Sequence, residues 1–218
     1  MNSTTGNPMK PLNRTLLAAL LASLLGTGCV PLIVGGAMVG TVNVATDRRT
    51  SGTQLEDEGI ELKAATRIRE KFGDRGHISV NSYNRVVLLT GEVASEADRA
   101  ALDGVAGGVE NVQKVLNETA VMGASSLTSR SNDVAIASKV KAKLIDARDL
   151  ISNAFYVVVE RGTVYLMGRV TEREANRATE LVRQTSGVTK VVRAFEIISE
   201  EELARITPKP KTGDTTPR

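Results

Sequence analysis

The 218-residue sequence contains few of the residues on which most catalytic, metal-binding and nucleic-acid-binding sites depend. It has one cysteine, one histidine and no tryptophan, and aromatic residues make up only 3% of the chain. One cysteine and one histidine exclude disulfide frameworks and zinc fingers. So few aromatic side chains argue against a base-stacking surface for nucleic acid. No glycine-rich nucleotide motif is present either, so we expect no enzymatic activity, no cofactor, no metal and no nucleic-acid partner.

The first residues have the pattern of an export signal. Lys10 and Arg14 precede an apolar run of ten residues, Leu16–Leu25, and small residues follow it. The run is too short to span a bilayer, which takes about 20 apolar residues. The segment before Met9 lacks this pattern, so both Met1 and Met9 stay open as the start of the protein.

Cys29 directly follows the small residues and resembles the acylated cysteine of bacterial lipoproteins. The lipoprotein pattern prefers Leu three residues before the cysteine, whereas here Leu25 lies one residue earlier. A free cysteine in an ordinary signal is the competing interpretation, but a lone cysteine in an exported chain has no partner for a disulfide. We expect a signal peptide at 1–28 and a lipidated (palmitate-bearing) cysteine with an apolar tether at 29–52. The residue after the cysteine is Val30 and not Asp, which by resemblance to enterobacterial lipoprotein sorting implies the outer membrane.

The remainder of the chain contains the same unit twice. Residues His77–Val93 align without a gap with Ala154–Val170, so that Gly91 meets Gly168. Two copies of an internal repeat of about 77 residues predict two small domains and no solenoid. We expect the first domain at 53–121, a linker at 122–131, the second domain at 132–198, and a short helix with a disordered tail at 199–218.

Each copy is predicted to fold as helix, strand, strand, helix and strand. The opening helices are expected at Glu56–Phe72 and Asp133–Ala147, and alternating apolar residues then indicate two strands joined by a tight turn. Gly91 and Gly168 are predicted to be structural turn residues. Because a sheet of three strands must bury one face, we place both helices on one face of a mixed sheet, in an α+β fold. The predicted helix-capping sequences are Thr53-x-x-Glu56, Ser95-x-x-Asp98, Thr171-x-x-Glu174 and Ser199-x-x-Glu202.

Two short motifs recur in both copies. The hairpins end in Leu-x-Gly-x-Val at Leu89–Val93 and Leu166–Val170, and a Gly-Val step precedes the last strand at Gly108 and Gly187. An αββαβ unit with these motifs resembles the BON domain, and two such units behind a lipoprotein signal are similar to dual-BON outer-membrane lipoproteins. The resemblance implies a tandem of BON domains on the periplasmic face of the outer membrane. It also implies a non-enzymatic role in envelope integrity and binding of anionic phospholipid, such as phosphatidylglycerol or cardiolipin.

The two copies differ in charge. Residues 56–120 contain 8 basic and 12 acidic residues, whereas residues 132–198 contain 11 basic and 8 acidic residues. Repeats of opposite charge are expected to face different partners. An anionic membrane surface would attract only the second copy.

The opening helix of the second copy is the candidate lipid-binding element. Its lysines have no acidic residue between them, although from the residues alone a solvated basic face is the competing interpretation. The BON resemblance implies that this helix contacts lipid. Ala135 stands where relatives place an aromatic residue, so we expect shallow, salt-sensitive binding. The candidate phospholipid-binding residues are Val134, Ala135, Ile136, Lys139, Lys141 and Lys143. A protein–protein adaptor for envelope or cell-wall assembly machinery is the alternative function.

Overall fold

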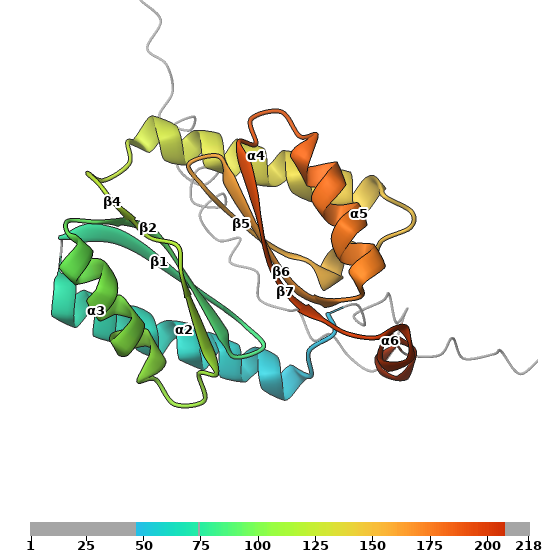
Figure 1. Cartoon of the computed structure of the whole chain (residues 1–218), viewed down its shortest axis with the longest axis horizontal. Coiled ribbons are helices and arrows are strands. Elements are labelled where there is room, and N and C mark those ends of the chain that lie inside the picture. Colours follow the sequence, from blue (N-terminus) through green and yellow to red (C-terminus); the bar gives the residue numbers. More distant parts are fainter. Residues whose placement is uncertain (1–46, 74, 208–218) are drawn as a thin grey trace, which may run out of the picture. The chain divides into compact units, whose positions relative to one another are not determined.

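The two copies fold as two α+β repeats in the computed structural model, which describes residues 47–73 and 75–207 (Figure 1). The predicted signal peptide, residues 29–46 of the predicted tether with Cys29, and residues 208–218 of the predicted tail therefore lie outside the described residues. The prediction of an α+β fold with two αββαβ units is confirmed.

The first repeat begins with one long helix and a hairpin. Its elements are α2 (Ser51–Phe72), β1 (Gly76–Tyr83), β2 (Val86–Val93), α3 (Glu96–Gly107), β3 (Lys114–Asn117) and β4 (Ala120–Val121). Strand β1 is antiparallel to β2, whereas β3 and β4 both pair with β2 in parallel. The last strand is interrupted because the Asn117 side chain accepts hydrogen bonds from the backbone N–H and the hydroxyl of Thr119.

The second repeat has the same order of elements. They are α4 (Leu127–Asp146), a 3₁₀ turn (Ser152–Ala154), β5 (Tyr156–Glu160), β6 (Thr163–Val170), α5 (Glu172–Arg183) and β7 (Lys190–Ile197), followed by α6 (Glu200–Ile206). Strand β5 is antiparallel to β6, and β7 is parallel to β6 along all eight of its residues.

The two opening helices begin earlier than predicted. The hydroxyl of Thr50, and not that of Thr53, caps α2 by accepting a hydrogen bond from the N–H of Thr53. Ser126 caps α4 in the same way, so α4 extends into the predicted linker and only residues 122–126 lie between β4 and α4. The predicted caps Ser95, Thr171 and Ser199 are confirmed, and at Thr171 the capping box is complete.

Each repeat has its own apolar core between its helices and one face of its sheet. In the first repeat Ile60, Ala64 and Ile68 of α2 pack against Val87 and Leu89 of β2. In the second repeat the matching side chains are Ile136, Val140 and Leu144 of α4 and Val164 and Leu166 of β6. Apolar side chains of α3 and α5 complete these two clusters. Both helices of a repeat therefore cover the same sheet face, as predicted.

The helix-free faces of the two sheets pack against each other. Tyr83 and Leu88 of the first sheet form one buried cluster with Tyr165 and Met167 of the second, all at most 5% exposed. The sheets thereby bury the faces that their own helices leave uncovered.

A buried aspartate at the same place in each repeat fixes the hairpin turn. Asp57 of α2 and Asp133 of α4 each accept two backbone hydrogen bonds from the turn between the following two strands. Residues in these turns have positive φ angles, which leaves their N–H groups without strand partners. The donors are Asn84 and Arg85 for Asp57, and Arg161 and Gly162 for Asp133, each at 2.8 Å.

Gly91 and Gly168, expected at turns, lie inside strands β2 and β6. Their φ angles are 104° and 151°, a region that side chains disfavour. A Cβ atom on Gly91 would lie 1.9 Å from the carbonyl oxygen of His77, and one on Gly168 would lie 2.2 Å from that of Ala154. Glycine is required here because the backbone of the preceding segment passes directly over it.

Replacing Gly91 with Ala is therefore expected to lower the free energy of unfolding by about 2–4 kcal/mol, because the backbone must move to admit the methyl group. Gly104→Ala in α3 is the matched control, since nothing lies within 4 Å of its Cβ position. The control is expected to raise stability by up to about 1 kcal/mol through helix propensity. Urea denaturation measures both, and equal stabilities of the two variants would contradict this account.

Candidate functional site

Helix α4 has one buried side and one exposed side. Ile136, Val140 and Leu144 are at most 2% exposed and belong to the core of the second repeat. Ile136 was predicted to contact lipid, but at 0% exposure it cannot reach a ligand outside the fold. Val134 and Ala135 lie on the exposed side, as their predicted role requires.

A line of apolar side chains runs along the exposed side of α4. Leu127, Val134 and Ile145 are 80%, 67% and 67% exposed. At 3.6 residues per turn, their spacings of seven and eleven residues place them within about 20° of one another on the helix. Only small residues and Lys141 lie between them in this line. The result is a narrow apolar ridge that no part of the described chain covers.

Two of the three predicted lysines are unpaired. Lys141 lies in the line of the ridge, whereas Lys139 lies about 120–140° further around the helix. Lys139 and Lys141 are exposed, and neither ammonium group has a hydrogen bond or ion pair within residues 47–73 and 75–207. Lys143 is different, because it is half-buried and its Nζ donates to the carbonyl oxygen of Gln184 at 2.7 Å. Gln184 caps the C-terminus of α5, where a cation is favoured by the helix dipole.

The first repeat uses the same contact. Arg67 on α2 is the counterpart of Lys143, and its guanidinium donates to the carbonyl oxygen of Gly108, the C-cap of α3. A cation that joins the two helices in both repeats has a structural role. Lys143 is therefore removed from the candidate binding residues.

Sequence reasoning missed Leu127 and Ile145. Leu127 lies outside the predicted helix, which began at Asp133. Ser126 is a favourable N-cap residue, and its side chain accepts a hydrogen bond from the N–H of Ser129, so the sequence contained a signal for the earlier start. Ile145 could have been found by counting eleven positions on from Val134. With these corrections the site consists of the outer face of α4, defined by Leu127, Val134, Ala135, Lys139, Lys141 and Ile145.

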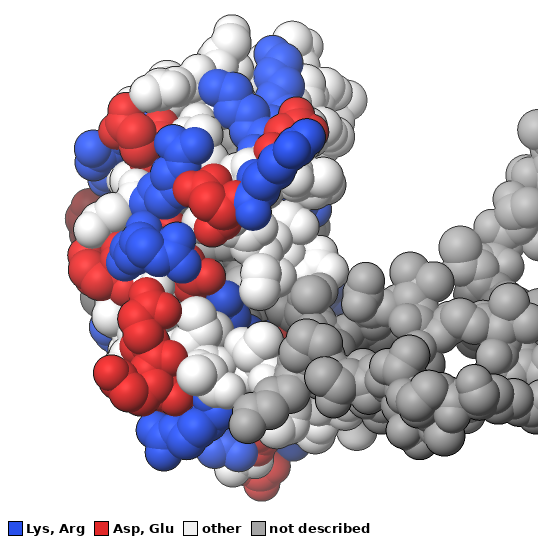
Figure 2. Space-filling view, turned by 90° about the vertical axis from the view of Figure 1, so that its right-hand side faces the viewer, with Lys and Arg blue, Asp and Glu red and all other residues white. Residues whose placement is uncertain are grey.

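The face formed by α5 and α6 differs from the outer face of α4, because its charges are paired. Basic and acidic side chains are interspersed over it (Figure 2). Charges neutralised in this way produce no strong field of one sign. The ion pairs that involve α5 on this face are Arg173–Glu200 at 3.7 Å, Arg177–Asp149 at 2.9 Å and Arg193–Glu172 at 2.9 Å.

A buried carboxylate lies between the two sheets. Glu92 of β2 is 0% exposed, and neither of its carboxylate oxygens accepts a hydrogen bond from the described residues. The side chain of Arg161 lies 3.7 Å away, too far for a hydrogen bond. Burial raises the pKa of Glu160 on β5, and the negative charges of Glu92 and Asp133 raise it further. Two acidic side chains, Glu92 and Glu160, therefore lie near each other at this end of the junction, and Arg161 offsets them only in part.

The described residues contain no group of three or more His, Cys, Asp and Glu side chains that could hold a metal ion. None of the helices in the same part of the chain is both long and apolar enough to cross a membrane.

The fold and the site define a class of protein with two small αββαβ modules in tandem, in which the second module presents an apolar and basic helix face. The chain belongs to the BON domain family, whose profile matches residues 61–123 and 132–199.

Several characterised proteins are similar to this chain. It is 35% identical over 193 residues to the outer membrane lipoprotein DolP of Haemophilus influenzae, covering 87% of this chain and 98% of that protein. A 21 kDa hemolysin of Actinobacillus pleuropneumoniae is 28% identical and covers 70% of this chain and 79% of its own length. Osmotically-inducible protein Y of Escherichia coli is 29% identical and covers 83% of this chain and 93% of its own length.

The charge between the sheets predicts a pH dependence of stability. Because the pKa of Glu160 is raised in the folded protein, folding takes up a proton, and the destabilisation by Glu160 is relieved as the pH falls through its folded pKa. Glu160→Gln is expected to raise the free energy of unfolding at about pH 7.5 by about 1 kcal/mol, and by less at about pH 5.5. Urea denaturation at both pH values measures this, with the exposed Glu70→Gln as control. A difference that grows on acidification would refute the assignment.

Proposed function

We propose that this protein is a non-enzymatic, lipid-anchored protein on the periplasmic face of the outer membrane, where it supports envelope integrity. Its second repeat binds anionic phospholipid, such as phosphatidylglycerol or cardiolipin, through the outer face of α4. The observation that carries the proposal is the exposed line of Leu127, Val134 and Ile145, which includes the unpaired Lys141, on a helix that also exposes the unpaired Lys139.

Comparison of the two repeats supports a functional origin of this face. The core positions are apolar in both helices, since Ile136 of α4 corresponds to Ile60 of α2. The outer positions are apolar only in α4, because Val134 corresponds to Glu58 and Ile145 to Arg69. The BON fold itself therefore does not require apolar residues at these exposed places.

The chemistry of the face suits a shallow position at a membrane surface. Each lysine near an anionic leaflet contributes about 1 kcal/mol, and apolar side chains add to this when they enter the headgroup boundary. Such contacts are weak alone. Acyl chains on Cys29 would keep the second repeat at high local concentration beside the membrane, so weak contacts suffice. The similarity to an outer membrane lipoprotein over almost the whole chain supports this anchor.

Reversing the two free charges is expected to abolish vesicle binding. A soluble form that begins at Thr46 contains both apolar cores and is mixed with vesicles of phosphatidylcholine containing phosphatidylglycerol or cardiolipin. The double variant Lys139→Glu/Lys141→Glu should lose at least about tenfold in affinity, because it replaces attraction by repulsion. Sedimentation with the vesicles at low and high salt measures this.

The matched control for the charge reversal is Arg69→Glu/Lys71→Glu. It makes the same change of charge at the same spacing on exposed positions of α2 in the first repeat. Equal losses in the two double variants would mean that only net charge matters, and the assignment to α4 would fail.

Removing the apolar side chains is expected to weaken binding without changing its dependence on salt. Val134→Ser/Ile145→Ser should lower affinity about tenfold, as partial burial of two aliphatic side chains contributes about 1.5 kcal/mol. Leu55→Ser/Leu62→Ser is the control, since these leucines of α2 are 70% and 71% exposed in the first repeat. A loss confined to the control pair would place the lipid contact in the first repeat.

An adaptor that binds another protein is the second candidate function. Leu55 and Leu62 form an exposed apolar pair on α2, one helix turn from the acidic side chain of Glu58. Arg69 continues this line seven residues beyond Leu62, so the apolar pair has both acidic and basic neighbours and suits a protein surface of mixed charge, as in an envelope or cell-wall assembly. Failure of the unsubstituted soluble form to bind anionic vesicles would favour this second function.

A further inference from the structure

The segment that leads from the predicted tether into the first repeat contacts both repeats. Asp47, Arg48 and Arg49 directly precede Thr50, the cap of α2. The two arginine side chains lie at a bend of the chain and contact different partners. Arg48 binds the second repeat, and Arg49 binds the first.

Arg48 makes a buried, bidentate ion pair with α5. Its two Nη atoms lie 2.7 and 2.8 Å from the two carboxylate oxygens of Glu174, and Nη1 also donates to the carbonyl oxygen of Arg169 at 2.8 Å. The side chains of Arg48 and Glu174 are only 5% and 3% exposed. Burial alone would raise the pKa of Glu174, but the hydrogen bonds from Arg48 and from the backbone of Thr171 lower it.

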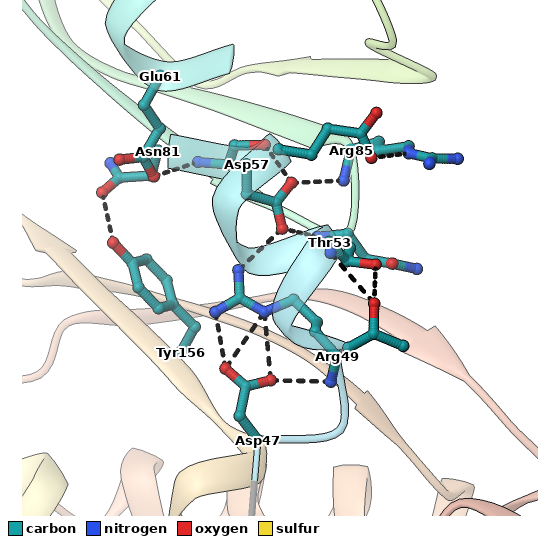
Figure 3. A network of polar contacts seen from close by, with 12 residues as sticks. Asp47, Arg49, Thr53, Asp57, Glu61, Asn81, Arg85 and Tyr156 are labelled. Carbon is teal, nitrogen blue, oxygen red and sulfur yellow. Dashed lines mark hydrogen bonds and ion pairs between the residues drawn. The ribbon is translucent and has the colours of Figure 1, made fainter. Parts of the chain in front are cut away.

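Arg49 is held on the first repeat by Asp57 and Tyr83, and it also pairs with Asp47; Figure 3 shows the two aspartates. Its guanidinium binds Asp47 at 2.7 Å and Asp57 at 2.8 Å, and Asp57 is the aspartate that fixes the turn of the hairpin β1–β2. The guanidinium also lies over the ring of Tyr83, 4.2 Å from its centroid. Tyr83 belongs to the apolar cluster between the two sheets.

These contacts are geometrically specific and largely buried. A bidentate arginine–carboxylate pair fixes both partners in one orientation. Removing one member of a buried pair leaves the other charge without compensation, which is far more costly than the loss of an exposed ion pair. Moving either arginine out of its site would therefore leave a buried carboxylate without its positive partner.

We propose that Asp47, Arg48 and Arg49 form a clasp that fastens the base of the membrane tether to both repeats. The second repeat, which carries α4, is then held directly to the anchored segment as well as through the first repeat and residues 122–126. Arg48 acts as a positioning residue for α4 at the membrane. This role rests on the proposed function, whereas the clasp itself does not.

Protease protection tests the clasp without any membrane. The mature full-length protein is treated with trypsin, and cleavage after Arg49 is followed by mass spectrometry. Arg48→Ala should be cleaved at this bond at least about tenfold faster than wild type, because the open form of the segment becomes more populated. Arg69→Ala, which removes an exposed arginine from α2, should leave the rate unchanged.

A second variant separates loss of the clasp from general unfolding. Glu174→Gln removes the charge that Arg48 binds but keeps an acceptor oxygen for the N–H of Thr171. It should accelerate cleavage as much as Arg48→Ala does, and the double variant should add nothing further. Equal rates in wild type and Arg48→Ala, or fully additive effects, would overturn the clasp.

The positioning role is tested on lipidated protein in vesicles that contain phosphatidylglycerol. Acylation of Cys29, checked by mass spectrometry, leaves Ser138→Cys on α4 as the only free thiol for an environment-sensitive fluorophore. Arg48→Ala should reduce the membrane-inserted fraction of this probe at least twofold. Release of residues 47–49 lengthens the free part of the tether by only three residues, so a longer tether alone would not explain this reduction. An unchanged fraction would overturn the positioning role.

The soluble form distinguishes the two proposals. Without the anchor, wild type and Arg48→Ala should bind the same vesicles equally, because α4 is intact in both. If neither form binds, the proposed function fails while the protease result still decides the clasp. If the soluble Arg48→Ala form alone loses binding, Arg48 supports the fold of the second repeat and has no positioning role.

Discussion

A three-stranded sheet that carries both of its helices on one face leaves its other face without a cover. In this chain each sheet covers the other, through Tyr83 and Leu88 on one side and Tyr165 and Met167 on the other. Neither repeat alone could bury these side chains. The same arrangement leaves the outer faces of α2 and α4 free, because each helix buries only the side that meets its own sheet.

Packing two sheets face to face also brings polar groups between them, and the two ends of the junction treat these groups differently. At one end Arg49 compensates Asp47 and Asp57 and lies over Tyr83, so every charge has a partner. Toward Glu92 and Glu160 the negative charges are not balanced in this way. A buried charge without a full partner is unfavourable. The paired end therefore fixes its side chains in one arrangement, whereas at the acidic end protonation of Glu160, whose pKa is raised, relieves the repulsion.

The sequence was sufficient for features that depend on local patterns and insufficient for those that depend on distant contacts. The internal repeat predicted the order of elements, and local capping patterns predicted Ser95, Thr171 and Ser199 as caps. The predicted start of α2 was wrong because Thr50 and Thr53 are both favourable N-cap residues, and only the folded structure selects Thr50. The structural role of Lys143 depends on α5, and the partner of Arg48 lies 126 residues away. No local pattern contains such pairs.

The two opening helices show where this fold leaves room for function. Their inner faces match position by position, with Ile60, Ala64 and Ile68 in α2 corresponding to Ile136, Val140 and Leu144 in α4. Their outer faces do not match, because packing against the sheet places no demand on them. Substitutions on such exposed positions change stability little, so they can differ between repeats according to the partner that each one meets. The scaffold is thus shared, and the two outer faces differ in which of their positions are apolar and which are charged.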